Sequence, residues 1–239
     1  MSSSVAQEEE VVFDDAPTLD NWSTGPEVGE TIPAIVGMDQ HGNEVTFDDV
    51  KGPNGAYIVF HRSADWWPFC KTQLVQLEQS YSDLAAQGLG VVAISYDTVE
   101  ILQAFSERKG PFSYTMIADP ESEVIEAFDL RNPNPESGSR VDGMAYPGSY
   151  IVDANGVVQE KFFAESHRQR VTSDTVLMSV YGVGKSGGQR LEADVPPQFK
   201  LVAFPSEEEI LAGNSFALMV EFEMYDKVHL YGEGSDYTA

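Results

Sequence analysis

The feature that most constrains the fold is a short segment that joins an apolar run to a helix carrying a lone cysteine. Residues 56–60 (Ala-Tyr-Ile-Val-Phe) lack polar alternation, which is typical of a strand buried on both faces. A loop follows, and Pro68 opens a predicted helix, because proline is well tolerated in a first helical turn. Cys70, the only cysteine of the chain, lies in this first turn. The segment therefore predicts a strand–loop–helix unit with a thiol at the helix N-terminus.

Strands and helices alternate through the central part of the chain. The helix that begins near Pro68 has one apolar face, formed by Leu74, Leu77, Tyr81 and Leu84 at steps of three and four residues. Further strands are predicted at 34–38, 45–47, 90–95 and 116–117, further helices at 99–109, 119–128 and 168–180, and a hairpin at 149–152 and 157–163. This order predicts an α/β fold with a layered sheet.

The two ends of the chain differ from this centre. Residues 1–24 are predicted to be an acidic flexible arm, residues 25–181 the α/β domain, and residues 182–190 a linker rich in glycine. Residues 191–239 show strand patterns at 200–204, 216–224 and 228–231. Three or four strands are fewer than the roughly seven of an independent sandwich. This β-rich segment is thus expected to pack on the domain or on a partner, or to stop before its natural end.

Composition excludes several classes of function. The net charge is −25, from 14 basic and 39 acidic residues, and such a surface repels nucleic acid and anionic membranes. One cysteine excludes an intrachain disulfide framework and a cysteine-rich zinc site, and the four histidines are scattered, so we expect no metal or other cofactor. No signal peptide or apolar span is recognisable, so the chain is expected to be cytoplasmic. The oligomeric state is left open.

Two segments far apart in the chain resemble a known family. The order strand, Arg-Ser-Ala-Asp-Trp-Trp-Pro-Phe-Cys over 62–70, helix, and then Gly-Met-Ala-Tyr-Pro-Gly-Ser-Tyr-Ile-Val-Asp-Ala-Asn-Gly over 143–156 is similar to the peroxiredoxin-like (alkyl hydroperoxide reductase/thiol-specific antioxidant) branch of thioredoxin-fold proteins. The resemblance covers residues 25–181. It implies a thioredoxin-like central mixed sheet flanked by helices, and a cis peptide between Tyr146 and Pro147 beside the cysteine. The C-terminal segment resembles β-rich domains that are appended to some such proteins.

The resemblance makes Cys70 the candidate catalytic residue. A cysteine in the first turn of a helix faces unpaired backbone N–H groups and the positive end of the helix dipole, which favour the thiolate. Arg62 is the second candidate catalytic residue and Lys71 a further source of positive charge. The family implies attack on a hydroperoxide and formation of a sulfenic acid, which an external thiol then reduces. That thiol belongs to a thioredoxin-like protein or a small molecule.

The substrate pocket implied by the resemblance departs from the family pattern. The family motif is Pro-x-x-x-Thr-x-x-Cys, which places Ser63 at the proline and Trp67 at the threonine. The arginine that stabilises the thiolate in the family falls at Pro147, next to Tyr146. Arg62 is the candidate replacement for that arginine, and Ser63 for the hydroxyl. In a Cys-x-x-Cys protein, Trp67 would stand at the first cysteine.

Several roles stay open from the sequence. Cys70 is either a catalyst or a buried structural cysteine. His61 is either a base or a satisfied core histidine, and Asp65 either caps the helix or transfers a proton. The alternative to an antioxidant oxidoreductase is a redox-inactive thioredoxin-fold binding or scaffold protein, and a third possibility is mixed-disulfide chemistry at Cys70.

Overall fold

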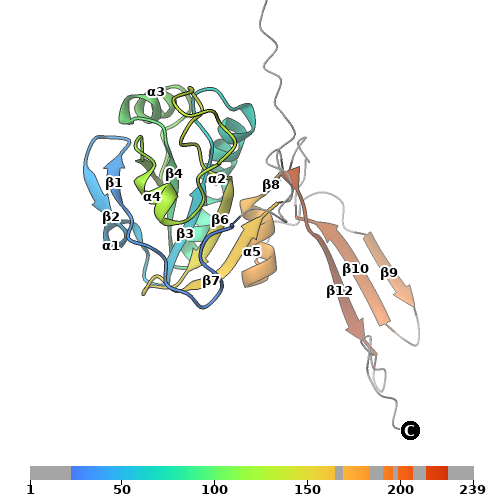
Figure 1. Ribbon diagram of the computed structural model, residues 1–239. Helices are drawn as coiled ribbons and strands as arrows, with labels where there is room; N and C mark the ends of the chain where they lie inside the picture. Colours follow the sequence, from blue (N-terminus) through green and yellow to red (C-terminus); the bar gives the residue numbers. More distant parts are fainter. Residues whose placement is uncertain (1–22, 165–168, 184–190, 196–198, 207–213, 226–239) are drawn as a thin grey trace, which may run out of the picture.

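The computed structural model describes residues 23–164, 169–183, 191–195, 199–206 and 214–225. Their main feature is a seven-stranded mixed sheet with the order β2-β1-β5-β4-β3-β6-β7 (Figure 1). Its strands are β1 (Val36–Asp39), β2 (Glu44–Thr46), β3 (Gly55–Phe60), β4 (Leu89–Ser95), β5 (Thr115–Ala118), β6 (Gly148–Val152) and β7 (Val158–Phe163). The helices are α1 (Phe47–Val50), α2 (Pro68–Ala86), α3 (Val99–Lys109), α4 (Glu123–Ala127) and α5 (Ser173–Tyr181).

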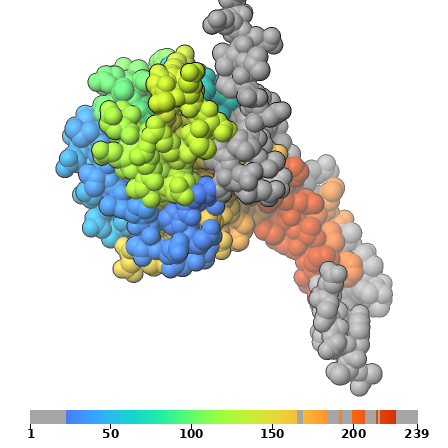
Figure 2. All heavy atoms as spheres, in the orientation of Figure 1, coloured from blue at the N-terminus to red at the C-terminus, as the bar shows by residue number. Residues whose placement is uncertain are grey.

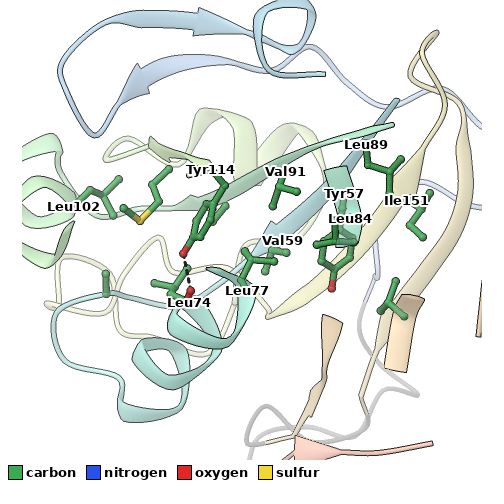
Figure 3. Packing of buried hydrophobic residues seen from close by; sticks show 14 of the residues in the cluster. Tyr57, Val59, Leu74, Leu77, Leu84, Leu89, Val91, Leu102, Tyr114 and Ile151 are labelled. Carbon is green, nitrogen blue, oxygen red and sulfur yellow. Dashed lines mark hydrogen bonds between the residues drawn. The ribbon is translucent and has the colours of Figure 1, made fainter. Parts of the chain in front are cut away.

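The central strand β3 explains why the apolar run at 56–60 lacks alternation. It pairs in parallel with β4 and antiparallel with β6, and every residue of it is buried. Tyr57 and Val59 face one hydrophobic cluster, and Ile58 and Phe60 face the other. Figure 3 shows the first cluster, in which the Tyr114 hydroxyl donates a hydrogen bond to the carbonyl of Leu74 on α2 (2.8 Å). The predicted sheet with helices on both faces is confirmed.

Most predicted elements lie within one or two residues of the observed ones, and the deviations have local causes. The helix expected from residue 119 begins at Glu123, because Ser122 has a left-handed backbone (φ 59°) that no helix continues through. The helix expected from residue 168 begins at Ser173, where Thr172 Oγ1 accepts a hydrogen bond from the Thr175 N–H and so caps it. Residues 170–171 instead form a short strand, β8 (Arg170–Val171).

A second, three-stranded antiparallel sheet follows the domain. It has the order β12-β10-β9, with β9 (Leu191–Val195), β10 (Phe199–Pro205) and β12 (Leu218–Met224). This sheet extends away from the seven-stranded domain (Figures 1 and 2). The strands expected at 200–204 and 216–224 are confirmed as β10 and β12. β9 was not predicted, and the strand expected at 228–231 lies outside the described residues, as do most of the predicted arm and linker.

One short element joins the C-terminal part of the chain to the domain. β11 (Asn214–Ser215) pairs in parallel with β8, so that Asn214 lies opposite Arg170. The Asn214 amide also donates a hydrogen bond to Gln76 Oε1 on α2 (3.1 Å). Within the described part of the chain, no helix is long and apolar enough to cross a membrane.

Candidate active site

Cys70 is the third residue of α2, after Pro68 and Phe69, and Trp67 is the N-cap residue. At a helix start the first backbone N–H groups have no partner within the helix and form the positive end of its dipole. The sulfur therefore lies where a negative charge is stabilised. The side chain is completely buried (0% exposed), so solvent does not reach the sulfur in this conformation.

Two donors from separate segments of the chain contact the sulfur. The backbone N–H of Arg62 donates to Cys70 Sγ (3.3 Å), and Nη2 of Arg170 lies 3.6 Å from the same atom. Arg170 is itself buried, and its other nitrogens donate to Gln73 Oε1 (3.0 Å) and to the carbonyl of Gln169 (2.6 Å). The guanidinium is thus oriented by hydrogen bonds on both sides. A buried, oriented cation beside a cysteine is the environment that favours a thiolate.

The two basic residues expected near the sulfur are placed differently. The guanidinium of Arg62 lies over the ring of Trp67, 4.9 Å from its centroid, and the backbone N–H of Arg62 donates to the sulfur. Lys71 donates from Nζ to the carbonyl of Asp65 (2.9 Å). Of the two roles left open for Asp65, capping of α2 is wrong. The helix begins one residue after Trp67, and this N-cap residue has no side-chain cap.

The loop before α2 is held in place by a buried carboxylate at the end of β4. Asp97 accepts hydrogen bonds from Ser63 Oγ (2.7 Å), from the backbone N–H of Ala64 (2.7 Å) and from Ser95 Oγ (2.9 Å). Burial raises the pKa of Asp97, although these hydrogen bonds oppose the shift. The hydroxyl of Ser63, expected in the substrate pocket, is thus engaged by Asp97 and also accepts from the Asp65 N–H (3.0 Å).

His61 follows β3 and is completely buried. Neither ring nitrogen has a hydrogen-bond partner within the described part of the chain. Burial, and secondarily the positive charge of Arg170, lowers the pKa of His61 to about 3. The imidazole is therefore neutral at physiological pH and adds no positive charge to the site.

Tyr146 and Pro147 are both buried just before β6. The Tyr146 hydroxyl donates to the carbonyl of Ala164 (2.7 Å). Burial raises the pKa of Tyr146, although the charges of Arg170 and Arg62 oppose the shift. The expected cis peptide at Pro147 is wrong. Within the described residues, the cis bond is Gly110–Pro111, and Pro147 follows a trans bond.

The remaining aromatic side chains near the start of α2 pack against one another. Trp67 is almost completely buried and packs edge-on against Trp66, with 5.4 Å between the ring centroids. Trp66 Nε1 donates to the hydroxyl of Tyr96 (2.8 Å). In the portion that the structure describes, no group of three or more histidine, cysteine, aspartate or glutamate side chains is arranged to hold a metal ion.

A mixed sheet with a cysteine in the first turn of the helix after its central strand defines a thioredoxin-like thiol protein. The AhpC/TSA family model matches residues 28–161, more than half of the chain, and the chain belongs to this family. Alkyl hydroperoxide reductase C of Staphylococcus aureus is 33% identical over 119 residues, which are 48% of this chain and 58% of that protein. The chain thus spans less than two thirds of the curated relatives it matches.

Solved structures support the same fold at lower identity. Peroxiredoxin 6 of Arenicola marina superposes with a TM-score of 0.57 at 20% identity, over 75% of this chain and 84% of that one. AhpC of Enterococcus faecalis gives a TM-score of 0.54 at 20% identity, over 65% and 90% of the two chains. The family and fold resemblances predicted from the sequence are therefore confirmed.

Sequence reasoning missed Arg170 and gave no role to Asp97. Arg170 stands 100 residues after Cys70, in a segment predicted to be helix, and no local pattern links the two. Asp97 follows the second buried strand, at the carboxyl edge of the sheet, where functional side chains gather in α/β folds. That position was the available signal, but which donors the carboxylate would bind is decided only by the fold.

Proposed function

We propose that this chain is a one-cysteine thiol peroxidase that reduces hydrogen peroxide or alkyl hydroperoxides through Cys70. The observation that carries the proposal is the environment of the sulfur. It lies at the N-terminus of α2, accepts from the Arg62 N–H and contacts the guanidinium of Arg170. Membership of the AhpC/TSA family supports the same reaction class.

The proposed reaction balances with an external thiol as reductant. The Cys70 thiolate attacks one oxygen of the peroxide, an S–O bond forms as the O–O bond breaks, and the departing oxygen takes a proton to leave as water or an alcohol. Cys70 becomes a sulfenic acid. A first external thiol displaces water to form a mixed disulfide, and a second releases Cys70 and an external disulfide. Because Cys70 is the only cysteine, no second thiol of this chain can resolve the intermediate.

In this proposal Arg170 takes the role of the arginine that the family pattern would place at Pro147. Its guanidinium stabilises the thiolate before attack and the negative charge that develops on the peroxide oxygens during attack. The hydroxyl that the family supplies from the position of Trp67 has no equivalent there. The peroxide enters only when the covering side chains separate, because the sulfur is fully buried.

A second candidate function, a redox-inactive thioredoxin-fold binding protein, is favoured by one observation. Cys70 is 0% exposed, and Trp67, which is 3% exposed, occupies the family's threonine position. A buried cysteine of this kind behaves as a small apolar residue. The two functions differ in whether the sulfur reacts with peroxide in the folded protein.

Trapping of the sulfenic acid tests the proposal. The full chain is treated with one equivalent of hydrogen peroxide in the presence of dimedone, and Cys70 is examined by mass spectrometry, with Cys70→Ser as the control. Stoichiometric labelling of the parent and none of Cys70→Ser is expected. An unlabelled parent that has a native circular dichroism spectrum, and a thiol that titrates after denaturation, would rule out the peroxidase and leave the binding protein.

A further inference from the structure

The described charged side chains of the C-terminal sheet lie on one face, and the other face is apolar. Cross-strand partners share a face, and the register pairs Leu201 with Phe222 and Lys200 with Glu223. The face that carries Leu201 and Phe222 also carries Leu191, Phe199, Leu218 and Val220. We call these six residues the apolar face. The opposite face carries the charged residues Glu192, Lys200, Glu221 and Glu223, together with Val202, Phe204 and Met219.

The apolar face is open to solvent. Leu191 and Leu218 are each 62% exposed, Phe222 is 44% exposed and Val220 38% exposed. Phe216, two residues before Leu218, is 47% exposed. In water, a sheet with one apolar face is stable when that face packs against another layer. Figures 1 and 2 show this sheet extending from the domain, so the seven-stranded sheet does not provide that layer.

We propose that the apolar face is a self-association surface that packs against the same face of a second copy of this chain. Two three-stranded sheets stacked at about 10 Å form a six-stranded sandwich with its apolar side chains inside. A two-fold axis brings the same face of both copies together, so a surface that is apolar throughout is complementary to itself. This proposal does not depend on the chemistry of Cys70.

The exposed area is sufficient for a specific dimer. Taking about 200 Å² for a fully exposed large side chain, the four exposed residues of the apolar face and the adjacent Phe216 together contribute roughly 500 Å² of apolar surface per copy. This is at the upper end of the largest apolar patch of a typical monomer, about 300–600 Å². Two copies would bury roughly 1,000 Å² from these side chains alone, which is about the minimum for a specific interface.

The distribution of charge favours a second copy over a differently charged partner. The whole chain carries a net charge of −25, so copies repel each other over most of their surfaces. No charged residue stands on the apolar face, and stacking places the glutamates on the two outer surfaces of the sandwich. They are then separated by more than the Debye length of about 8 Å at physiological ionic strength. A cationic partner would be attracted to the opposite face, where the glutamates lie.

Sedimentation velocity of the full chain tests the proposal. We expect a monomer–dimer equilibrium between about 1 and 200 μM, a range typical of interfaces at the lower size limit. Phe222→Glu buries a carboxylate in the proposed interface and should weaken the dimer at least about tenfold. The matched control is Glu223→Gln, the next residue of the same strand on the opposite face, which should leave the dimer unchanged or slightly tighter.

Two results would overturn the proposal. One is a monomer throughout the concentration range, which would leave the face to a different partner. The other is a dimer that Phe222→Glu does not weaken, which would assign self-association to another surface. If Phe222→Glu loses the native circular dichroism spectrum, Leu218→Ser replaces it, because Leu218 is the more exposed of the two and contributes less to the fold of the monomer. The same outcomes then decide.

Discussion

Replacement of Arg170 by methionine tests whether its guanidinium controls the reactivity of Cys70. Methionine retains an unbranched apolar chain similar to the aliphatic part of arginine but removes the charge and the donor that lies 3.6 Å from the sulfur. The Arg62 N–H and the start of α2 continue to stabilise the anion. The variant should therefore react more slowly with electrophiles without becoming inert.

The magnitude follows from the contact that is lost. A hydrogen bond from a charged donor contributes about 1.5–3 kcal/mol. At 1.36 kcal/mol for each factor of ten, the loss of this stabilisation of the anion corresponds to a factor of about ten to a hundred. The rate of alkylation, which depends on the thiolate, should fall by the same factor. Arg170→Lys retains the charge and should recover part of the rate.

The assay is alkylation of the full chain by iodoacetamide, quenched with acid and measured by intact mass, since one cysteine gives one adduct. Arg140→Met is the matched control, because the guanidinium of Arg140 lies over the ring of Trp66 rather than beside the sulfur. Loss of the nearby charge should also raise the pKa of His61 in an NMR titration, which checks that the guanidinium has been removed from the site. A natively folded Arg170→Met that reacts at the parent rate would refute the reasoning.

Three further predictions concern the surroundings of the sulfur. Asp97→Ala leaves three buried donors without their acceptor and should lower the free energy of unfolding by about 3–5 kcal/mol in urea titrations. The control is Asp65→Ala at an exposed position, which should change the free energy of unfolding by less than about 0.5 kcal/mol. A small change for Asp97→Ala would mean that water replaces the carboxylate. The pKa of His61 is lowered to about 3, so between about pH 3 and 6.5 the unfolded chain binds more protons than the folded one, and stability should fall on acidification by up to about 1.4 kcal/mol per pH unit. His61→Leu should remove this slope while the opposing slope from the raised pKa of Asp97 persists in both proteins, and parallel stability curves for parent and variant would contradict it. Trp67→Ala removes a buried ring beside the helix start and should cost about 3–5 kcal/mol of stability while raising the alkylation rate of Cys70 at least about tenfold. The control is Trp66→Ala. An unchanged alkylation rate in Trp67→Ala would show that Trp67 does not shield the sulfur.

Local sequence patterns predicted the elements that local interactions decide. The all-apolar run of β3 is visible because both faces of that strand are buried, and the start of α2 is visible because Pro68 suits a first helical turn. The position of Cys70 follows from these two facts. The starts of α4 and α5 were misplaced, since the left-handed backbone of Ser122 and the cap at Thr172 depend on turn geometry rather than on the apolar pattern.

The contacts of the candidate site could not be predicted from the sequence, for a different reason. Arg170 approaches the sulfur because β8 lies beside the helix start in the folded chain, and 100 intervening residues leave no spacing rule. The family resemblance placed the stabilising arginine at position 147, where this chain has proline. It also predicted a cis peptide bond before Pro147, which is trans in the structure. Arg62 was proposed for its charge, and its backbone N–H, which any residue other than proline provides, also donates to the sulfur.

The pairing of β8 with β11 determines where the cysteine domain can be excised. Asn214 lies beside Arg170 in that pairing and also contacts Gln76 of α2, while Ser206 and Thr175 place their hydroxyl oxygens 3.2 Å apart. A fragment that stops after α5 would contain the whole region that the family model matches yet lack the strand that flanks Arg170. The structural boundary of the thiol domain is thus discontinuous in sequence. Any shortened form intended to report on Cys70 has to retain the chain through β11.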